Sequence, residues 1–326
     1  MKWLITGGCG FIGVNLIKKL EKLGQKLRVV DNLSVGSVDD LPSNNWEIFD
    51  EVTDLKKISW KKKQIFTLDL RNKKNLNYIM SEADYVVHLA ASTGVKLSVE
   101  NFNQDFTNNV LSTLNLLEAA KKQSIKKFIF ASSGAPLGFQ KPPIHEDKPL
   151  SPKSPYGASK MAGEGYCSAF SGSYDLNTTI LRFSNVYGPG SYKKESVVAK
   201  FIKDCICNQK ILINGDGQQT RDFLYISDLI QAILLSTNVK KCGEIFQIAS
   251  GKETSIKELS KIILDNLKNK LDFKINIKNL DPLKFEVKRN YSDISKAKKM
   301  MNFEPKVPLE EGLKKTIEYY IKIYKK

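Results

Sequence analysis

The sequence predicts an α/β protein in which a doubly wound parallel sheet is followed by a smaller α+β domain at the C-terminal end. Residues 1–184 alternate short apolar runs with helical apolar periods, which is typical of βαβ units with helices on both faces of a parallel sheet. After Asn185 this alternation gives way to a mixed order of helices and strands. The chain of 326 residues is about twice as long as a typical domain, so two coupled domains are expected.

The elements of the first region follow from apolar periodicity. Short continuous apolar runs predict buried strands, and apolar residues that recur every three or four positions predict helices. The expected strands are Lys2–Thr6, Leu27–Asp31, Gln64–Leu70, Tyr85–Leu89, Lys127–Ser132 and Thr178–Phe183. The expected helices are Phe11–Leu23, Phe106–Lys122 and Tyr156–Phe170.

The second region is expected to be of mixed type, because its helices and strands do not alternate regularly. The expected helices are Val197–Cys207, Ser227–Thr237, Ser255–Leu267, Ile294–Met301 and Leu309–Tyr324. The expected strands are Ile211–Asn214, Glu244–Ile248 and Phe273–Ile277.

The chain is strongly basic, with 51 lysines and arginines, 35 aspartates and glutamates, and a net charge of +16. Such a charge attracts polyanions. However, nearly all these cations are lysines spread over the expected helices and loops, so we expect a solvated surface and no nucleic-acid partner. Because lysine fills the ordinary basic positions, the few arginines are expected where a rigid bidentate group matters, as at a phosphate.

Cysteine usage and hydropathy bear on metals and on location. The five cysteines form no Cys-x-x-Cys pair, so we expect reduced thiols, with neither a disulfide framework nor a metal site. The N-terminal residues lead directly into a buried strand, and no 18-residue apolar run follows. We therefore expect a cytoplasmic protein without a signal peptide or a membrane span.

A glycine-rich loop follows the first expected strand. Gly8, Gly10 and Gly13 match the GxGxxG pattern, in which glycines allow a tight turn and a close approach of the backbone to a pyrophosphate. The helix that follows turns its N–H groups and its positive dipole end toward the phosphates. Asp31 ends the second strand, where a carboxylate accepts hydrogen bonds from a ribose and repels a 2′-phosphate. The loop therefore predicts a Rossmann domain that binds NAD rather than NADP.

A tyrosine and a lysine stand in helical register after Ser154-Pro155. Tyr156 and Lys160 are four residues apart, so they are expected on one face of a helix that begins at the proline. To act as a base near neutral pH, a tyrosine needs its pKa lowered by roughly 3 units. We expect the Lys160 ammonium, together with the positive nicotinamide ring, to lower it. Ser133, at the end of a strand, is expected to hold the reacting oxygen.

These motifs resemble the extended short-chain dehydrogenase/reductases, specifically the NAD-dependent nucleotide-sugar epimerase/dehydratase group, and within it the UDP-glucose 4-epimerases. The resemblance spans essentially the whole chain, including the stretches 88–91, 181–189 and 215–228. It implies cofactor contacts from Gly7, Gly10, Phe11, Ile12, Gly13, Asp31, Asn32, Asp69, Leu70, Leu89, Ala90, Ala91, Asn109, Tyr156 and Lys160. It implies catalysis by Ser133, Tyr156 and Lys160, and substrate contacts from Ser133, Asn185 and Arg221.

The expected domain assignment follows from this resemblance. Residues 1–184 are expected to form the NAD-binding Rossmann domain, to which residues 224–250 return. Residues 185–223 and 251–326 are expected to form a domain that binds the nucleotide sugar. The resemblance also implies a homodimer through the helices Phe106–Lys122 and Tyr156–Phe170.

Members of this group share an oxidation at sugar C4, in which the tyrosine takes the hydroxyl proton while a hydride passes to NAD. Dehydratases of the group carry acidic residues directly after the catalytic hydroxyl residue, and UDP-glucuronate decarboxylases carry a glutamate two residues after it. Here Gly134 and Ala135 occupy these places. Without an acid there, we expect the transient 4-keto sugar to receive the hydride on its other face. This reaction is C4 epimerisation of the UDP-glucose/UDP-galactose type.

Departures from the group's pattern leave the sugar open. Residues 136–138 read Pro-Leu-Gly instead of Val-Tyr-Gly. Leu283, next to Lys284, stands where UDP-glucose 4-epimerases carry a second diphosphate-binding arginine, and Arg289 is the candidate to replace it. The resemblance implies that Asn290 lines the sugar pocket, where its modest polar side chain would admit a 2-acetamido or 6-carboxyl sugar. The alternatives are therefore a UDP-glucuronate or UDP-N-acetylhexosamine epimerase, another 4-keto-forming nucleotide-sugar enzyme, and a non-enzymatic RNA-binding relative.

Overall fold

The computed structural model of the chain describes all residues except 269, 271–274, 283–286 and 325–326. The chain forms two compact units. The first unit comprises Met1–Gly138, Pro149–Arg182 and Ile230–Phe246. The second unit comprises Phe139–Lys148, Phe183–Leu229 and Gln247–Lys326.

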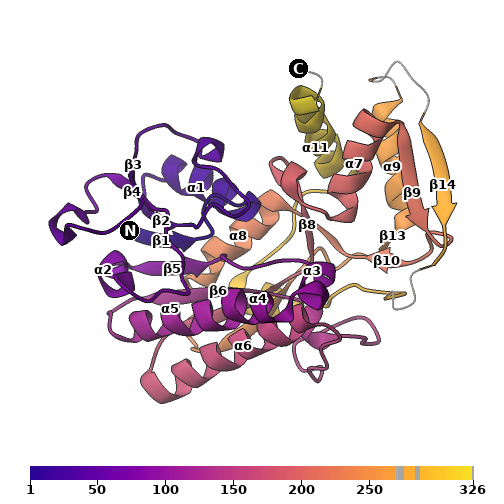
Figure 1. Cartoon of the computed structure of the whole chain (residues 1–326). Helices are drawn as coiled ribbons and strands as arrows, with labels where there is room; N and C mark the ends of the chain where they lie inside the picture. The colour runs from indigo at the N-terminus through magenta and orange to yellow at the C-terminus, as the bar shows by residue number, and fades with distance from the viewer. Residues whose placement is uncertain (269, 271–274, 283–286, 325–326) are drawn as a thin grey trace. The chain divides into compact units, whose positions relative to one another are not determined.

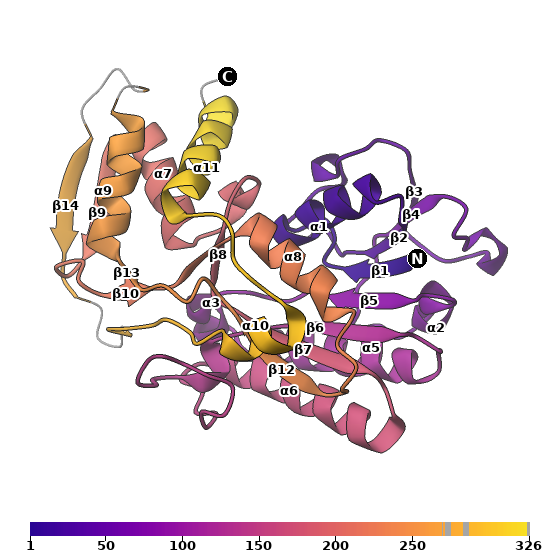
Figure 2. The same ribbon diagram turned by 180° about the vertical axis from the view of Figure 1, so that it is seen from behind.

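The main sheet is parallel and has the strand order β12-β7-β6-β5-β1-β2-β4-β3 (Figure 1; β7 and β12 are labelled in Figure 2). Its strands are β1 (Lys2–Thr6), β2 (Lys26–Val30), β3 (Trp46–Phe49), β4 (Lys63–Phe66), β5 (Tyr85–His88), β6 (Lys127–Ser133), β7 (Thr178–Phe183) and β12 (Glu244–Ile248). The direction of winding reverses at β1, which pairs with β2 on one side and with β5 on the other. This order confirms the doubly wound class, in which ligands bind at the carboxyl ends of the strands beside the reversal.

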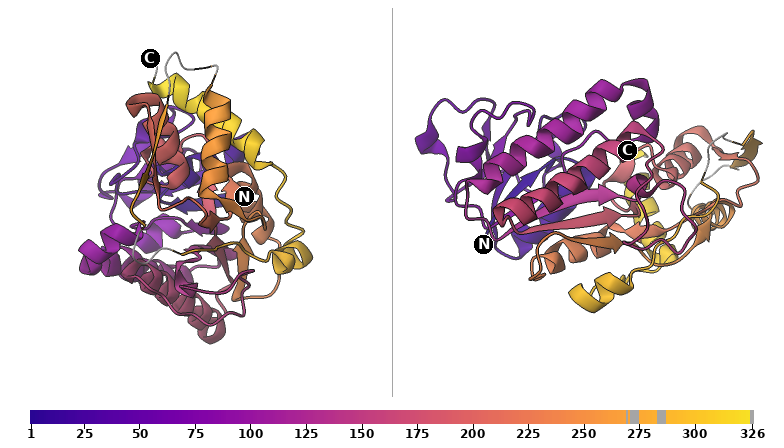
Figure 3. Two further views of the ribbon diagram at one scale, coloured as in Figure 1. Left: turned by 90° about the vertical axis from the view of Figure 1, so that its right-hand side faces the viewer. Right: turned by 90° about the horizontal axis from the view of Figure 1, so that it is seen from below.

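Helices cover both faces of this sheet. They are α1 (Phe11–Lys22), α2 (Leu76–Met80), α3 (Val95–Glu100), α4 (Phe102–Phe106), α5 (Ser112–Lys121), α6 (Pro155–Tyr174) and α8 (Ile226–Ser236). In α1, Leu16, Ile17 and Leu20 are buried, at the spacing that places them on one helical face. The helices α5 and α6 lie side by side along the other face of the sheet (Figure 3).

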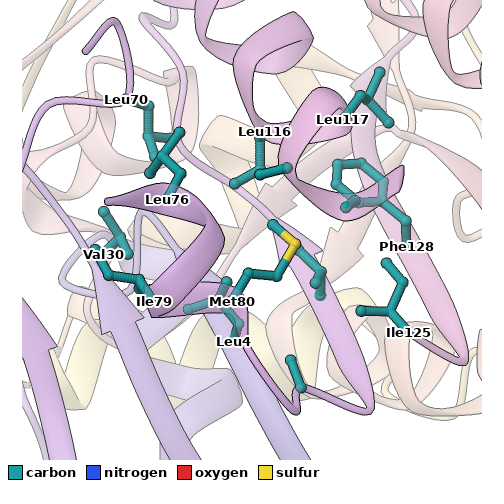
Figure 4. Close-up of a cluster of buried hydrophobic side chains, with 14 of the residues drawn as sticks. Leu4, Val30, Leu70, Leu76, Ile79, Met80, Leu116, Leu117, Ile125 and Phe128 are labelled. Carbon is teal, nitrogen blue, oxygen red and sulfur yellow. The ribbon is translucent and has the colours of Figure 1, made fainter. Parts of the chain in front are cut away.

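A buried apolar cluster fills the layer between the sheet and the helices α2 and α5 (Figure 4). Leu4 and Val30 reach it from neighbouring strands, while Leu116 and Leu117 reach it from α5. Alternate residues of a strand point to opposite faces of a sheet. The residues that flank Leu4 and Val30 in the chain therefore point toward the opposite face of the sheet. This packing holds the carboxyl ends of β1, β2 and β5 in fixed register.

Two of the five arginines lie in the interior of the first unit. The Arg28 guanidinium lies 3.9 Å from the centroid of the Trp60 ring, and burial lowers the pKa of Arg28 to about 10. Arg182 in β7 makes two hydrogen bonds with the Glu164 carboxylate of α6, at 2.9 and 2.7 Å. Arg182 therefore uses the bidentate geometry expected of the few arginines, but its partner is a buried carboxylate instead of a phosphate. Arg28 packs in the core against an aromatic ring.

Several expected elements differ from those observed. The expected helix Phe106–Lys122 is divided by a π-helical turn, η3 (Thr107–Leu111), between α4 and α5. The strand β3 was not expected, because its residues are only partly buried at the sheet edge and carry no long apolar run. The expected strand Gln64–Leu70 ends earlier, at Phe66.

The second unit is of the expected mixed α+β type. Its helices are α7 (Val197–Asn208), α9 (Ile256–Leu267), α10 (Ser295–Met301) and α11 (Leu309–Tyr324). Its strand pairs are β9 (Lys210–Asn214) with β14 (Asn276–Leu280), β8 (Asn185–Tyr187) with β11 (Phe223–Tyr225), and β10 (Thr220–Arg221) with β13 (Thr254–Ser255). The helices α7 and α9 pack on β9, and α11 packs against both helices (Figure 2).

The expected strand Phe273–Ile277 begins in residues that lie outside the described part of the chain. In the described part, the strand β14 starts at Asn276. Among the described residues, no helix combines the length and the apolar content that crossing a bilayer requires.

Candidate active site

The glycine loop after β1 is packed so closely at Gly7 and Gly13 that a side chain is excluded at both positions. Gly7 has a positive φ of 68°, and a Cβ on it would lie 2.6 Å from the Ala90 nitrogen. A Cβ on Gly13 would lie 2.5 Å from the Gly7 carbonyl oxygen. The backbone N–H of Gly10 donates to that same oxygen at 3.2 Å. The loop, the first turn of α1 and the end of β5 are therefore in close backbone contact.

The N-terminal end of α1 has the features of an anion site. Gly10 precedes the helix and supplies no side-chain cap, and Phe11 and Ile12 begin it. The first turn contains no acidic residue, whereas Lys19 and Lys22 lie in the last turn. Because the first N–H groups of a helix lack partners within the helix, they favour a phosphate. The bare loop and the uncapped helix therefore fit the pyrophosphate of a dinucleotide.

Asp31 follows β2 at the same edge of the sheet. Its two carboxylate oxygens accept hydrogen bonds at 2.9 Å from the backbone N–H groups of Cys9 and Leu33. Burial raises the pKa of Asp31, and these two hydrogen bonds act against that rise. The carboxylate is thus fixed beside the glycine loop, with acceptor capacity left for ribose hydroxyls.

The other predicted cofactor residues lie at the ends of β4 and β5. Arg71 makes a bidentate pair with Asp69, and this pair, with a hydrogen bond from Asn32, lowers the pKa of Asp69. The Leu70 carbonyl oxygen accepts from Asn115 of α5 at 3.0 Å.

After β5, the backbone N–H groups of Leu89 and Ala90 donate to the backbone and side-chain oxygens of Thr6, at 3.1 and 3.3 Å. Ala91 is half-buried. The Asn109 side chain, in the π-helical turn, bonds the Ser92 backbone at 2.8 and 3.0 Å. The strand ends and this turn are therefore joined around one edge of the sheet.

Ser133, Tyr156 and Lys160 are brought together in the first unit. The helix α6 begins at Pro155, and the Ser154 hydroxyl caps it by accepting from the Gly157 N–H at 3.1 Å. The Tyr156 hydroxyl hydrogen-bonds the Ser133 side chain, which ends β6. Lys160, one turn further along α6, donates to the Ala131 carbonyl oxygen at 2.9 Å.

Burial shifts the pKa values of Tyr156 and Lys160 in opposite directions in the protein alone. Loss of hydration at the buried hydroxyl raises the pKa of Tyr156, although its hydrogen bond with Ser133 acts in the opposite direction. Burial also lowers the pKa of Lys160 to about 8. In the protein alone, burial therefore keeps Tyr156 protonated, and the expected lowering of its pKa by Lys160 together with the nicotinamide ring remains a prediction for the NAD-bound enzyme.

Apart from Ser133, the predicted substrate residues lie in the second unit. The Asn185 side chain donates to the Asp222 carbonyl oxygen at 3.3 Å, and Arg221 donates to the carbonyl oxygens of Thr220 and Val287 at 2.7 Å. Arg289 makes a bidentate pair with Glu253, at 2.8 and 2.7 Å. Residues 283 and 284, where the second diphosphate arginine was sought, lie outside the described part of the chain.

Two buried acids near Tyr156 and Lys160 were missed by the sequence analysis. Asp105 stands four residues before Asn109 on the preceding helical turn, and Glu164 stands four residues after Lys160. The helical spacing to a predicted site residue was visible in the sequence. Their burial was not, because it depends on how α4, α6 and β7 pack together.

Comparison with known proteins places this geometry in a family. The sequence profile described as the NAD dependent epimerase/dehydratase family matches residues 3–249. A UDP-glucuronate 4-epimerase of Thermodesulfobacterium geofontis is 36% identical over 97% of this chain and 95% of its own length.

Two solved structures have nearly the same fold. The UDP-glucose 4-epimerase of Thermotoga maritima with UDP-glucose has a TM-score of 0.87, with 35% identity over 99% of both chains. The UDP-N-acetylglucosamine 4-epimerase of Methanobrevibacter ruminantium M1, in complex with UDP-N-acetylmuramic acid, has a TM-score of 0.88, with 33% identity over 99% of this chain and 98% of that one. The chain therefore belongs to the NAD dependent epimerase/dehydratase family, with NAD as its cofactor.

Proposed function

We propose that the protein is a 4-epimerase of UDP-sugars that interconverts UDP-glucose and UDP-galactose. The observation that carries this proposal is the turn after Ser133. Gly134, Ala135 and Pro136 directly follow Ser133 in the sequence. Ala135–Leu137 form a short 3-10 turn. None of these side chains can take or give a proton. The chain therefore offers no acid or base at this turn for the C–H bonds beside sugar C4.

The catalytic residues suit a proton transfer at one sugar hydroxyl. The Ser133 and Tyr156 side chains hydrogen-bond each other, so a hydroxyl that binds between them is within reach of both. Tyr156 takes the proton of that hydroxyl and later returns it, while Ser133 holds the oxygen. The Lys160 ammonium stabilises the phenolate of Tyr156. Bound NAD supplies the hydride acceptor and donor for the sugar carbon.

Relatives support the reaction more than they support one sugar. The similar proteins described above are all 4-epimerases by description, but they are named for UDP-glucuronate, UDP-glucose and UDP-N-acetylglucosamine. The shared element is the change at C4. UDP-glucuronate and UDP-N-acetylglucosamine are therefore the alternative substrates, and elimination of water from the 4-keto sugar is the alternative reaction within the family.

We assign the nucleotide diphosphate to Asn185 and Arg221, with Arg289 as a further cation. The backbones of Thr220 and Lys288 are hydrogen-bonded at 2.9 Å, so the segments that carry the two arginines run side by side. A diphosphate must displace Glu253 from Arg289 to use it. On this proposal, residues 1–184 with 224–250 bind NAD, and residues 185–223 and 251–326 bind the nucleotide sugar.

We also propose a homodimer through the helices 106–122 and 156–170. Apolar side chains are exposed on the neighbouring short helices α3 and α4, and contiguous exposed apolar surface is typical of protein interfaces. The exposed residues are Val95, Leu97, Val99, Phe102 and Phe106. Light scattering of the purified chain tests this point directly, and a mass of 36.8 kDa in solution would contradict it.

The proposed function is tested by a proton NMR time course of the purified protein without added NAD. UDP-glucose, UDP-glucuronate and UDP-N-acetylglucosamine are supplied in separate samples. We expect the anomeric signal of the galacto epimer to appear with UDP-glucose. Epimerisation of another sugar alone would transfer the assignment to that sugar. A product that has lost water, or no reaction in any sample, would refute the proposal.

A further inference from the structure

A buried carboxylate lies beside the proposed catalytic pair. Asp105, in α4, is only 3% exposed. Its Oδ1 accepts a hydrogen bond from the Asn109 side-chain nitrogen at 2.9 Å. The Ser159 hydroxyl, from α6, hydrogen-bonds the same carboxylate. An acid that is buried in this way is costly unless hydrogen bonds and an opposite charge compensate for the lost water.

The same contacts tie Asp105 to the backbone that carries the catalytic tyrosine. The Ser159 hydroxyl lies 3.0 Å from the Tyr156 carbonyl oxygen and accepts from the Asn109 side chain at 3.2 Å. Asn109 in turn bonds the Ser92 backbone after β5. A single polar network thus joins α4, the start of α6 and the carboxyl edge of the sheet.

The charge of Asp105 acts on both catalytic side chains. Burial raises the pKa of Asp105, while Ser159, the Lys160 ammonium and Asn109 act against that rise. After burial, Asp105 is the largest influence on Lys160, and it raises the Lys160 pKa. Asp105 also raises the pKa of Tyr156. One carboxylate therefore favours the protonated form of both partners.

We propose that Asp105 is a positioning residue of the reaction centre, whose buried negative charge holds the protons of Lys160 and Tyr156 and so sets the pH range of the reaction. This inference rests on the proposed function, since it concerns the same tyrosine and lysine. The inference adds Asp105 to the proposed catalytic residues as a positioning residue, because Asp105 acts through Tyr156 and Lys160.

The other ionisable groups in the described part of this region leave Asp105 as the controlling charge. On α6, Glu164 also faces Lys160, but Arg182 pairs with it at 2.7 Å. Cys167 is neutral because burial raises its pKa, and His88 of β5 is neutral because burial lowers its pKa to about 3.

The helices that pack against α4 bring little further charge. On α3, Lys96 and Glu100 form an exposed pair at 3.8 Å. The turn η3 has no ionisable side chain.

The test is the pH dependence of kcat/KM for wild type, Asp105→Asn and the control Glu100→Gln. Asparagine keeps an acceptor for Asn109 and removes the charge. The limbs of its profile, which report the titrations of Tyr156 and Lys160, should both move to lower pH by about 0.5–1 unit. Glu100→Gln removes an exposed charge one helix away and should leave both limbs in place. A merely structural role predicts lower activity with unmoved limbs, and that result would overturn the inference.

Two further measurements keep the inference testable. If Asp105→Asn does not fold, Asp105→Ser, which is smaller and also neutral, should show the same displacement. Fluorine NMR of the chain with fluorotyrosine in place of Tyr156 reads the tyrosine titration without turnover, and neutralising Asp105 should lower its midpoint. An unmoved midpoint overturns the inference whether or not the wild type epimerises a sugar. A wild type without turnover on every UDP-sugar overturns the proposed function alone.

Discussion

The buried pair of Glu164 and Arg182 makes a strong prediction about stability. Both side chains are 2% exposed, and the pair is bidentate, with a further hydrogen bond from Ser132 to Glu164 at 2.5 Å. Glu164→Gln keeps the shape but leaves the guanidinium in the interior without its counter-charge. Removing one partner of a buried pair costs about 3–5 kcal/mol. That is a large part of the roughly 5–15 kcal/mol that stabilises a folded protein.

Urea unfolding followed by circular dichroism measures this loss as a lower midpoint. The matched control is Glu253→Gln, which breaks a bidentate pair of the same geometry whose arginine side chain is 59% exposed. Because water solvates the freed Arg289, the unfolding midpoint of the Glu253→Gln variant should hardly change. Equal midpoints for Glu164→Gln and wild type, or equal losses for the two variants, would refute the reasoning from burial.

Three further outcomes are expected. Gly13→Ala should lose bound NAD, because its Cβ would meet the Gly7 carbonyl oxygen at 2.5 Å. The control Gly172→Ala, whose Cβ would meet no atom outside its own helix within 4 Å, should retain NAD. The ratio of absorbance at 260 and 280 nm reads the bound NAD. Tyr156→Phe should remove turnover and retain NAD, and residual turnover would exclude Tyr156 as the base. Burial lowers the pKa of His88 to about 3, so the unfolded chain takes up a proton below pH 6.5 that the folded chain does not. Stability should therefore fall by about 1.4 kcal/mol per unit of acidification between those values, and His88→Gln should reduce that slope.

Local patterns carried most of the correct sequence-based predictions. The apolar period of α11 gave its observed bounds, Leu309–Tyr324, because the whole helix is amphipathic. The close contacts of Gly7 and Gly13 explain why the glycine pattern was informative, since the packed loop admits no Cβ at either place. The pairing of Tyr156 with Ser133 follows from a capped helix start and a strand end, both of which are visible in sequence.

The missed features depend on contacts between distant segments. Asp105 and Glu164 look like ordinary helical acids until α4, α6 and β7 are packed together. The scarcity of arginine predicted that the few arginines lie where a rigid bidentate group is needed, but not which partner they bind. Arg182 binds a buried carboxylate in the core. The upward shift of the Tyr156 pKa likewise depends on burial, which no spacing along the chain reveals.

The central claim is that the chain changes only C4 of the sugar, because the turn behind Ser133 holds no acid or base. The most direct measurement is mass spectrometry of the sugar nucleotide after many turnovers in deuterium oxide. A hydrogen that leaves C4 as hydride and returns to the same carbon never exchanges with solvent, so we predict an epimer that carries no deuterium on carbon. Deuterium at a carbon beside C4, or loss of water from the sugar, would show proton transfer at a neighbouring carbon and contradict the claim.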